Sequence, residues 1–170
     1  MKIFRFLPLV LLFLACKTVS VSVDYDKEAS FESIKTYAFL KTSVDKLEIS
    51  DLDKKRILRS IDEVMQTKGF AKSENPDVLI SLFTKEKERI DIYNSFNYGW
   101  GWHPFYGANY SHVSRTPEGT LIIDILDAKN RVLLWQGIGK GYLTQNPDQK
   151  DERIKTFVSE ILMQFPPTKK

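Results

Sequence analysis

Apolar and polar residues alternate along two short segments near the start of the chain. Over residues 19–25, Val and Tyr alternate with Ser and Asp, which is the period of two expected for a strand with one buried face. Residues 35–40 form a second short segment of this kind. From Ser50 to Gly69 the apolar residues take helical spacing, with Ser50 as the expected N-cap and Gly69 just past the C-terminus. The pattern predicts two strands followed by a helix.

Three further apolar segments and a second helix complete the pattern. We expect a long strand over 78–92, a central strand over 119–126 and a return strand over 131–143. The final helix begins near Asn146 and ends at Pro166. The order β-β-α-β-β-β-α predicts an α+β fold with two layers: a mainly antiparallel sheet of about five strands, and two helices covering one face.

The return strand contains three glycines on one face. Alternation places Gly137, Gly139 and Gly141 on the same side as Trp135. One interpretation is that a helix or the Trp ring packs closely against this bare backbone. The other is that the missing side chains leave a ligand cleft. A phosphate-binding loop is not predicted, because these glycines lie inside a strand and do not open a helix.

The first residues of the chain resemble an export signal. Lys2 and Arg5 precede about ten uncharged, largely apolar residues, which is too short a run for a membrane span and typical of a signal peptide. The run ends at Cys16 in the sequence Leu-Phe-Leu-Ala-Cys, which resembles a bacterial lipobox. We therefore expect residues 1–15 to be removed as a lipoprotein signal peptide, and Cys16 to carry acyl chains such as palmitate. The alternative is an ordinary signal peptide with an incidental cysteine.

The predicted anchor also suggests a location. The mature chain, residues 16–170, would be a single α+β domain joined to lipid by Lys17 and Thr18 alone. Lys17 replaces the Asp that retains some lipoproteins in the inner membrane, so we expect the bacterial cell envelope, and the outer membrane in particular. The partner expected first is the membrane, contacted through the N-terminal lipid.

Composition narrows the other partners and the chemistry. The chain has 170 residues, a formal net charge of +3 and one cysteine. One cysteine excludes an internal disulfide framework and a Cys-based zinc site. The net charge is too small to predict nucleic-acid binding, and two of the basic residues lie in the signal peptide. The aromatic and apolar content favours a folded domain over disorder.

Residues 93–110 are unusually rich in aromatic residues and glycine. They hold eight aromatic residues and no Lys, Arg, Asp or Glu. Three interpretations remain open: the rings fold over the open face of the sheet, they recognise an envelope glycan or another envelope protein, or they anchor the segment at a membrane interface. The candidate ligand-binding residues are Tyr98, Trp100, Trp102, Phe105 and Tyr106.

No catalytic arrangement is evident, so we predict no enzymatic activity, cofactor or metal. An alternative is a small envelope hydrolase or metal-binding protein that uses His103 and His112, but these lie nine residues apart without helical metal-site spacing. Asp124 and Asp127 have no partner at acid/base distance in the pattern. We expect loop histidines and an Asp that binds its own turn.

Several short motifs together resemble the DUF4136 family. They occur in order along nearly the whole mature chain. The motifs are Val23-Asp24-Tyr25-Asp26, Phe31 with Lys35-Thr36-Tyr37-Ala38-Phe39, Lys68-Gly69-Phe70 leading to Pro76-Asp77-Val78-Leu79, Gly119-Thr120-Leu121-Ile122-Ile123-Asp124, and Leu134-Trp135-Gln136-Gly137. The resemblance implies a bacterial envelope lipoprotein domain of unassigned role. The function expected is therefore that of a membrane-anchored binding or structural module.

Overall fold

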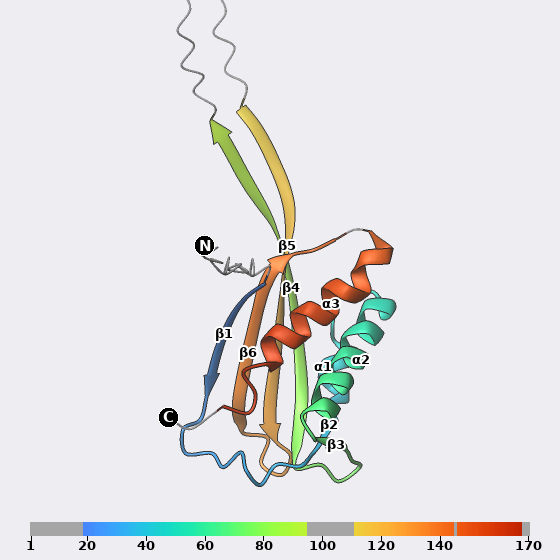
Figure 1. Ribbon diagram of the computed structural model, residues 1–170, viewed down its shortest axis with the longest axis vertical. Helices are drawn as coiled ribbons and strands as arrows, with labels where there is room; N and C mark the ends of the chain where they lie inside the picture. Colours follow the sequence, from blue (N-terminus) through green and yellow to red (C-terminus); the bar gives the residue numbers. More distant parts are fainter. Residues whose placement is uncertain (1–18, 95–110, 145, 168–170) are drawn as a thin grey trace, which may run out of the picture.

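A computed structural model describes residues 19–94, 111–144 and 146–167. Within these residues the chain forms six strands and three helices, packed as a sheet and a helical layer (Figure 1). The elements are β1 (Val19–Tyr25), β2 (Thr36–Phe39), α1 (Lys41–Asp45), α2 (Asp51–Thr67), β3 (Ala71–Lys72), β4 (Val78–Asn94), β5 (Ser111–Asp127), β6 (Leu133–Tyr142) and α3 (Pro147–Leu162).

The helix ends follow from their capping residues. The Ser50 side chain accepts a hydrogen bond from the Asp53 N–H at 3.1 Å, so the predicted N-cap of α2 is confirmed. Gly69, at φ 86°, follows the C-cap of α2 in the left-handed region that glycine adopts most easily. Asn146 caps α3 by accepting from the Asp148 N–H at 3.0 Å, and Pro147 occupies the first helical turn.

Four strands pair antiparallel, as predicted. The sheet order is β1-β6-β5-β4-β2-β3, and β1, β6, β5 and β4 alternate in direction. Apolar residues on one face of these strands pack against the helices. The fully buried residues include Ile80, Leu82, Ile123, Ile125 and Trp135. The predicted alternation of β1 is also confirmed, since its Val residues and Tyr25 are buried or half-buried while the residues between them are exposed.

The other end of the sheet differs from the prediction, because the sheet is mixed. Strand β2 pairs parallel to β4 and to the two-residue β3. Neither α1 nor β3 was predicted, so the expected five strands and two helices are six strands and three helices in the described residues. The physical reason is that α1 and α2 connect β2 to β4 as a crossover, which returns the chain in the same direction.

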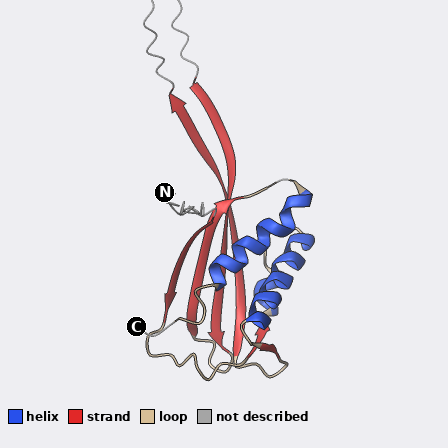
Figure 2. Cartoon of the chain, in the orientation of Figure 1, coloured by secondary structure: helices blue, strands red, loops and turns tan. Residues whose placement is uncertain are grey.

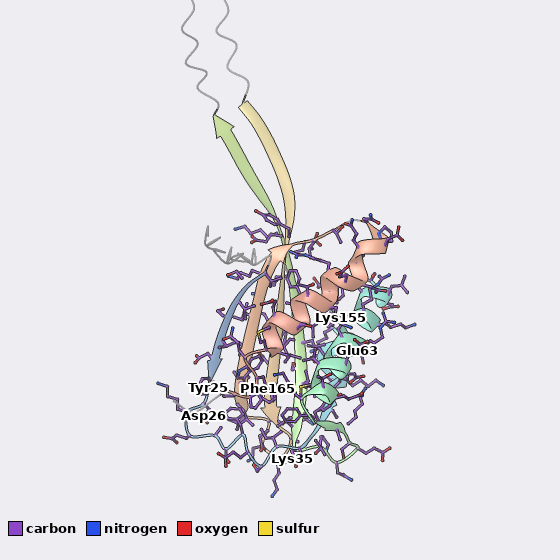
Figure 3. The ribbon with its side chains drawn as sticks, viewed as in Figure 1. Tyr25, Asp26, Lys35, Glu63, Lys155 and Phe165 are labelled. Carbon is purple, nitrogen blue, oxygen red and sulfur yellow. The ribbon has the colours of Figure 1, made fainter. Side chains whose placement is uncertain are left out.

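The helices cover one face of the sheet, as predicted (Figure 2). Helices α2 and α3 pack against each other, and α3 contacts β6 and β1. Lys155 of α3 donates to Glu63 of α2 at 2.7 Å, and both residues are labelled in Figure 3. After α3, Phe165 returns to the sheet and packs against Trp135 at a ring-centroid distance of 5.4 Å. The opposite face, called the open face below, carries no helix among the described residues.

Candidate functional site at the hairpin end of the sheet

Strands β4 and β5 form a hairpin that extends well beyond the rest of the sheet (Figure 1). The last row shared with β6 joins Lys87, Glu118 and Tyr142. Beyond it, the pairing of β4 with β5 continues for seven more rows, to Asn94 and Ser111. At about 3.3 Å per residue, these arms project about 23 Å from the sheet. Strand β5 therefore begins eight residues before the predicted start at 119, because pairing with β4 orders a segment whose own polar sequence gave no strand signal.

The chain enters the sheet at this same end. Val19, the first residue of β1, pairs with Gly141, and Gly141 pairs with Gly119. This row lies one step from the base of the hairpin arms. The N-terminal end of the described domain and the projecting hairpin therefore share one end of the molecule.

Most of the predicted site residues lie outside the described residues. They are Cys16, Tyr98, Trp100, Trp102, His103, Phe105 and Tyr106. His112 lies in β5, where its backbone pairs with Tyr93. The hairpin register thus brings the two ends of the aromatic segment together.

A cavity of about 760 Å³ lies on the helix side at this end of the sheet. Ile57, Leu121 and Phe157 are among its apolar lining residues, while Asp53 and Lys150 are among the charged ones. It thus combines an apolar lining with charged groups, and its volume falls in the range of small-molecule pockets.

The charged groups of this cavity are held in a network between the two helices. The Lys150 ammonium donates to Asp53 at 3.0 Å, and Arg56 donates to Asp53 at 2.8 Å and to Asp151 at 2.6 Å. Burial alone would raise the pKa of Asp53, but the hydrogen bonds from Lys150 and Arg56 outweigh it and hold that pKa below its ordinary value. Arg153 donates to the Tyr142 carbonyl at 2.8 Å and lies over the Phe157 ring. These contacts tie α2, α3 and β6 together.

The β6 backbone at Gly137 and Gly139 is covered by side chains. A Cβ atom on Gly137 would lie 2.3 Å from the Trp135 ring and 2.5 Å from Ile161, and one on Gly139 would lie 2.6 Å from Ile161. Both neighbours are fully buried. At these two glycines the interpretation that a helix or the Trp packs against bare backbone is confirmed, and the ligand-cleft interpretation is wrong.

The two aspartates considered for acid/base chemistry have structural partners. Asp124 accepts from the Gln136 amide at 2.8 Å, and burial raises the pKa of its carboxyl despite this bond. Asp127 accepts from the N–H groups of Lys129 and Asn130 at 3.0 and 2.7 Å, which confirms its predicted role in the turn. Across the described part of the chain, no group of three or more His, Cys, Asp or Glu side chains is placed to hold a metal ion.

The open face carries a surface that sequence reasoning missed. Its central row joins Phe83, Ile122, Ile138 and Ser22, and the next row toward the hairpin joins Lys85, Thr120, Lys140 and Ser20. Phe83 is 47% exposed. Each strand taken alone shows only alternation, and these residues become neighbours through the register of four strands.

The model of a domain of unknown function, DUF4136, matches residues 21–167, so the chain belongs to this family. A comparison with curated proteins finds no significant match.

Two solved structures share the fold at low sequence identity. A PDZ domain protein from Parabacteroides distasonis is 18% identical, with a TM-score of 0.54, over 90% of this chain and 37% of its own length. The PelC dodecamer from Paraburkholderia phytofirmans is 11% identical in one crystal form, with a TM-score of 0.52, over 85% of this chain and 94% of its own. The chain thus spans little more than a third of the first of these proteins. Both likenesses concern the fold alone.

No helix within residues 19–94, 111–144 and 146–167 is long and apolar enough to cross a bilayer.

Proposed function

We propose that this DUF4136 chain is a lipid-anchored module of the bacterial cell envelope, in the outer membrane, whose hairpin holds an aromatic tip against the membrane that carries its anchor. The observation that carries the proposal is the shared row of Val19, Gly141 and Gly119. It places the start of the domain at the base of the projecting hairpin.

The hairpin arms are longer than the predicted tether. Three residue steps separate Cys16 from Val19, which allows about 10 Å when fully extended. The arms extend about 23 Å from the same end. With Cys16 at the membrane surface, a hairpin that points straight at the bilayer would therefore pass into it.

The composition of the arms opposes such insertion. Glu88, Arg89 and Asp91 lie on one arm, and Arg115 lies on the other. Charged side chains are costly in the hydrocarbon region, whereas Trp and Tyr favour the headgroup region. The hairpin therefore lies obliquely, with its uncharged aromatic tip at the interface. A rise of about 10 Å over about 23 Å corresponds to strands inclined by about 25° to the membrane plane.

Chain length disfavours a covering role for the tip over the centre of the open face. Sixteen residues separate Asn94 from Ser111, so a loop that leaves and returns reaches about 27 Å. Phe83 lies eleven residues below Asn94 along β4, a distance of about 36 Å. The membrane-interface interpretation is the one that the arm length and the shared end favour.

Tryptophan quenching tests the proposal. The chain has three tryptophans, and Trp135 is fully buried, so Trp135→Phe leaves only Trp100 and Trp102 in the tip. The full lipidated chain would be reconstituted into liposomes that contain brominated lipids. We expect strong quenching in this variant. The control Trp100→Phe/Trp102→Phe, which keeps only Trp135, should resist quenching.

The same experiment separates the alternatives. Unquenched tip tryptophans that instead become protected on addition of purified envelope glycan would refute the membrane role in favour of glycan recognition. The anchor is tested separately by Cys16→Ser, which should release the protein from the membrane fraction in a carbonate wash. Retention of this variant would contradict lipid anchoring.

A further inference from the structure

We infer that the open face of the sheet, at the rows of Phe83 and Lys85, is the surface that lies on the bilayer and contacts anionic lipid headgroups. This inference rests on the proposed function and names the part of the domain, beyond the hairpin tip, that would recognise the membrane. The occupant is a lipid surface with negative charge.

The inclination of the strands requires one face of the sheet to be turned toward the membrane. With strands at about 25° to the bilayer plane, a two-layer domain presents either its helices or its open face. The outer surface of the helical layer carries ion pairs, such as Lys155 with Glu63 at 2.7 Å and Arg59 with Asp151 at 3.4 Å. The open face instead presents apolar side chains. No second layer of the described residues covers them.

The central row of the open face is apolar across three strands. Phe83 on β4 pairs with Ile122 on β5, which pairs with Ile138 on β6. Phe83 is 47% exposed, and both isoleucines are half-buried. Two rows closer to the hairpin, Tyr142 on the same face is 45% exposed. A contiguous apolar row that stays partly exposed in this way is characteristic of a surface that another body covers.

Positive charge lies between this row and the anchor. Lys85 and Lys140 occupy the row next to Phe83, and Lys87 occupies the following row opposite Glu118. All three lysines are exposed. The ion pairs of the described residues involve other groups, so these ammonium groups are available to lipid phosphates.

Two acids of the open face lie on the other side of the apolar row. Asp24 and Asp124 share the row that follows Phe83 away from the hairpin, together with Gln136. Charge on this face is therefore unequal at its two ends: three lysines and one acid, Glu118, lie toward the end where the chain enters, whereas Asp24 and Asp124 lie away from it. The predicted tether of about 10 Å holds the bilayer near Val19. An anionic bilayer at this position therefore lies closer to the lysines of the open face than to Asp24 and Asp124.

Lysine accessibility tests this orientation in the intact protein. The full lipidated chain would be reconstituted from outside into zwitterionic liposomes, or into liposomes containing anionic lipid, and treated with a membrane-impermeant amine reagent. We expect Lys85 and Lys140 to react about fivefold more slowly on the anionic liposomes, the factor that corresponds to about 1 kcal/mol per lysine at such a surface. Lys55 on α2 and Lys129 in the β5–β6 turn are internal controls and should react equally on both.

A matched pair of variants shows whether charge causes the protection. Lys85→Glu/Lys140→Glu should abolish the protection of Lys87 on anionic liposomes. Lys55→Glu/Lys129→Glu makes the same change in net charge away from the open face and should preserve it. Circular dichroism and urea unfolding of both variants would establish that each is folded.

The outcomes distinguish the inference from the proposed function. Equal labelling of Lys85 and Lys140 on both liposomes, with quenched tip tryptophans, would overturn the docking face and leave the membrane-facing hairpin intact. Unquenched tip tryptophans would overturn the proposed function, whatever the lysines show. Protection of Lys55 instead of Lys85 would assign the helical layer to the membrane and would also refute the inference.

Discussion

The packing of α3 on the glycine face of β6 can be tested with a single methyl group. In Gly137→Ala the new Cβ would lie 2.3 Å from the Trp135 ring and 2.5 Å from Ile161 Cγ2. Both distances are too short for carbon atoms in contact. Trp135 and Ile161 are fully buried, so neither has free space to move into. The variant must displace α3 or force strained rotamers.

The magnitude follows from two opposing effects. Overpacking of a filled core costs about 1–3 kcal/mol. Replacement of Gly by Ala raises the free energy of unfolding by about 0.4–1 kcal/mol, because it reduces the conformational entropy of the unfolded chain. We therefore expect Gly137→Ala to lower the free energy of unfolding by about 1–2 kcal/mol.

Gly119→Ala is a matched control. Its Cβ would lie 2.5 Å from Leu143 Cδ2 and 2.9 Å from Leu143 Cγ, a similar overlap, but Leu143 is half-buried in the segment after β6 and its whole side chain can rotate away about χ1. We expect this variant to remain within about 0.5 kcal/mol of the parent protein. Urea unfolding at constant m-value measures both changes. If Gly137→Ala were no more destabilising than Gly119→Ala, the proposed close packing of α3 against β6 would be refuted.

Three further predictions concern polar groups. Tyr37→Phe removes the hydroxyl that donates to Asp62 at 2.8 Å and should cost about 1 kcal/mol in urea unfolding; unchanged stability would contradict a stabilising role for this bond. Hydrogen bonds from the Lys35 N–H and from Thr36 hold the pKa of Asp77 below its ordinary value, so its stabilising effect is present above that value and lost as the pH falls through the lower folded pKa. Asp77→Asn should therefore show a smaller loss of stability in acid, in unfolding midpoints measured at a series of acidic pH values. Burial raises the pKa of Asp124, so its effect on stability depends on pH in the opposite direction to that of Asp77. Its stabilising contribution is fully present below the ordinary pKa and is lost as the pH rises through the raised value. The stability of Asp124→Asn relative to the parent protein should therefore increase as the pH rises. A stability difference that stays constant with pH would contradict this assignment.

The sequence predicted the antiparallel part of the fold because its signals are local. Alternation in β1 and the Ser50 cap of α2 depend on residues close together in the chain, and both are confirmed. The parallel pairing of β2 was missed because it depends on where a crossover returns the chain. The two residues of β3 are too few to show a period.

The candidate site divides in the same way. Cys16 and the aromatic residues Trp100 and Trp102 are conspicuous by composition, so the sequence predicts them as site residues, and they lie outside the described residues. The row of Phe83, Ile122 and Ile138 could not be found, because no sequence spacing relates residues on three strands before their register is known.

The sequence by itself determined the periodicity of each element and the caps of α2 and α3, and it predicts export of the chain through a signal peptide over residues 1–15. Only the tertiary structure decided that β1 begins, at Val19, beside the base of the hairpin. It also decided that the Trp135 and Ile161 side chains pack against the backbone at Gly137 and Gly139. The physical reason is that period and capping arise from neighbours along the chain, whereas register and packing arise from contacts that exist only when distant segments meet. The proposed orientation on the membrane depends on contacts of this second kind.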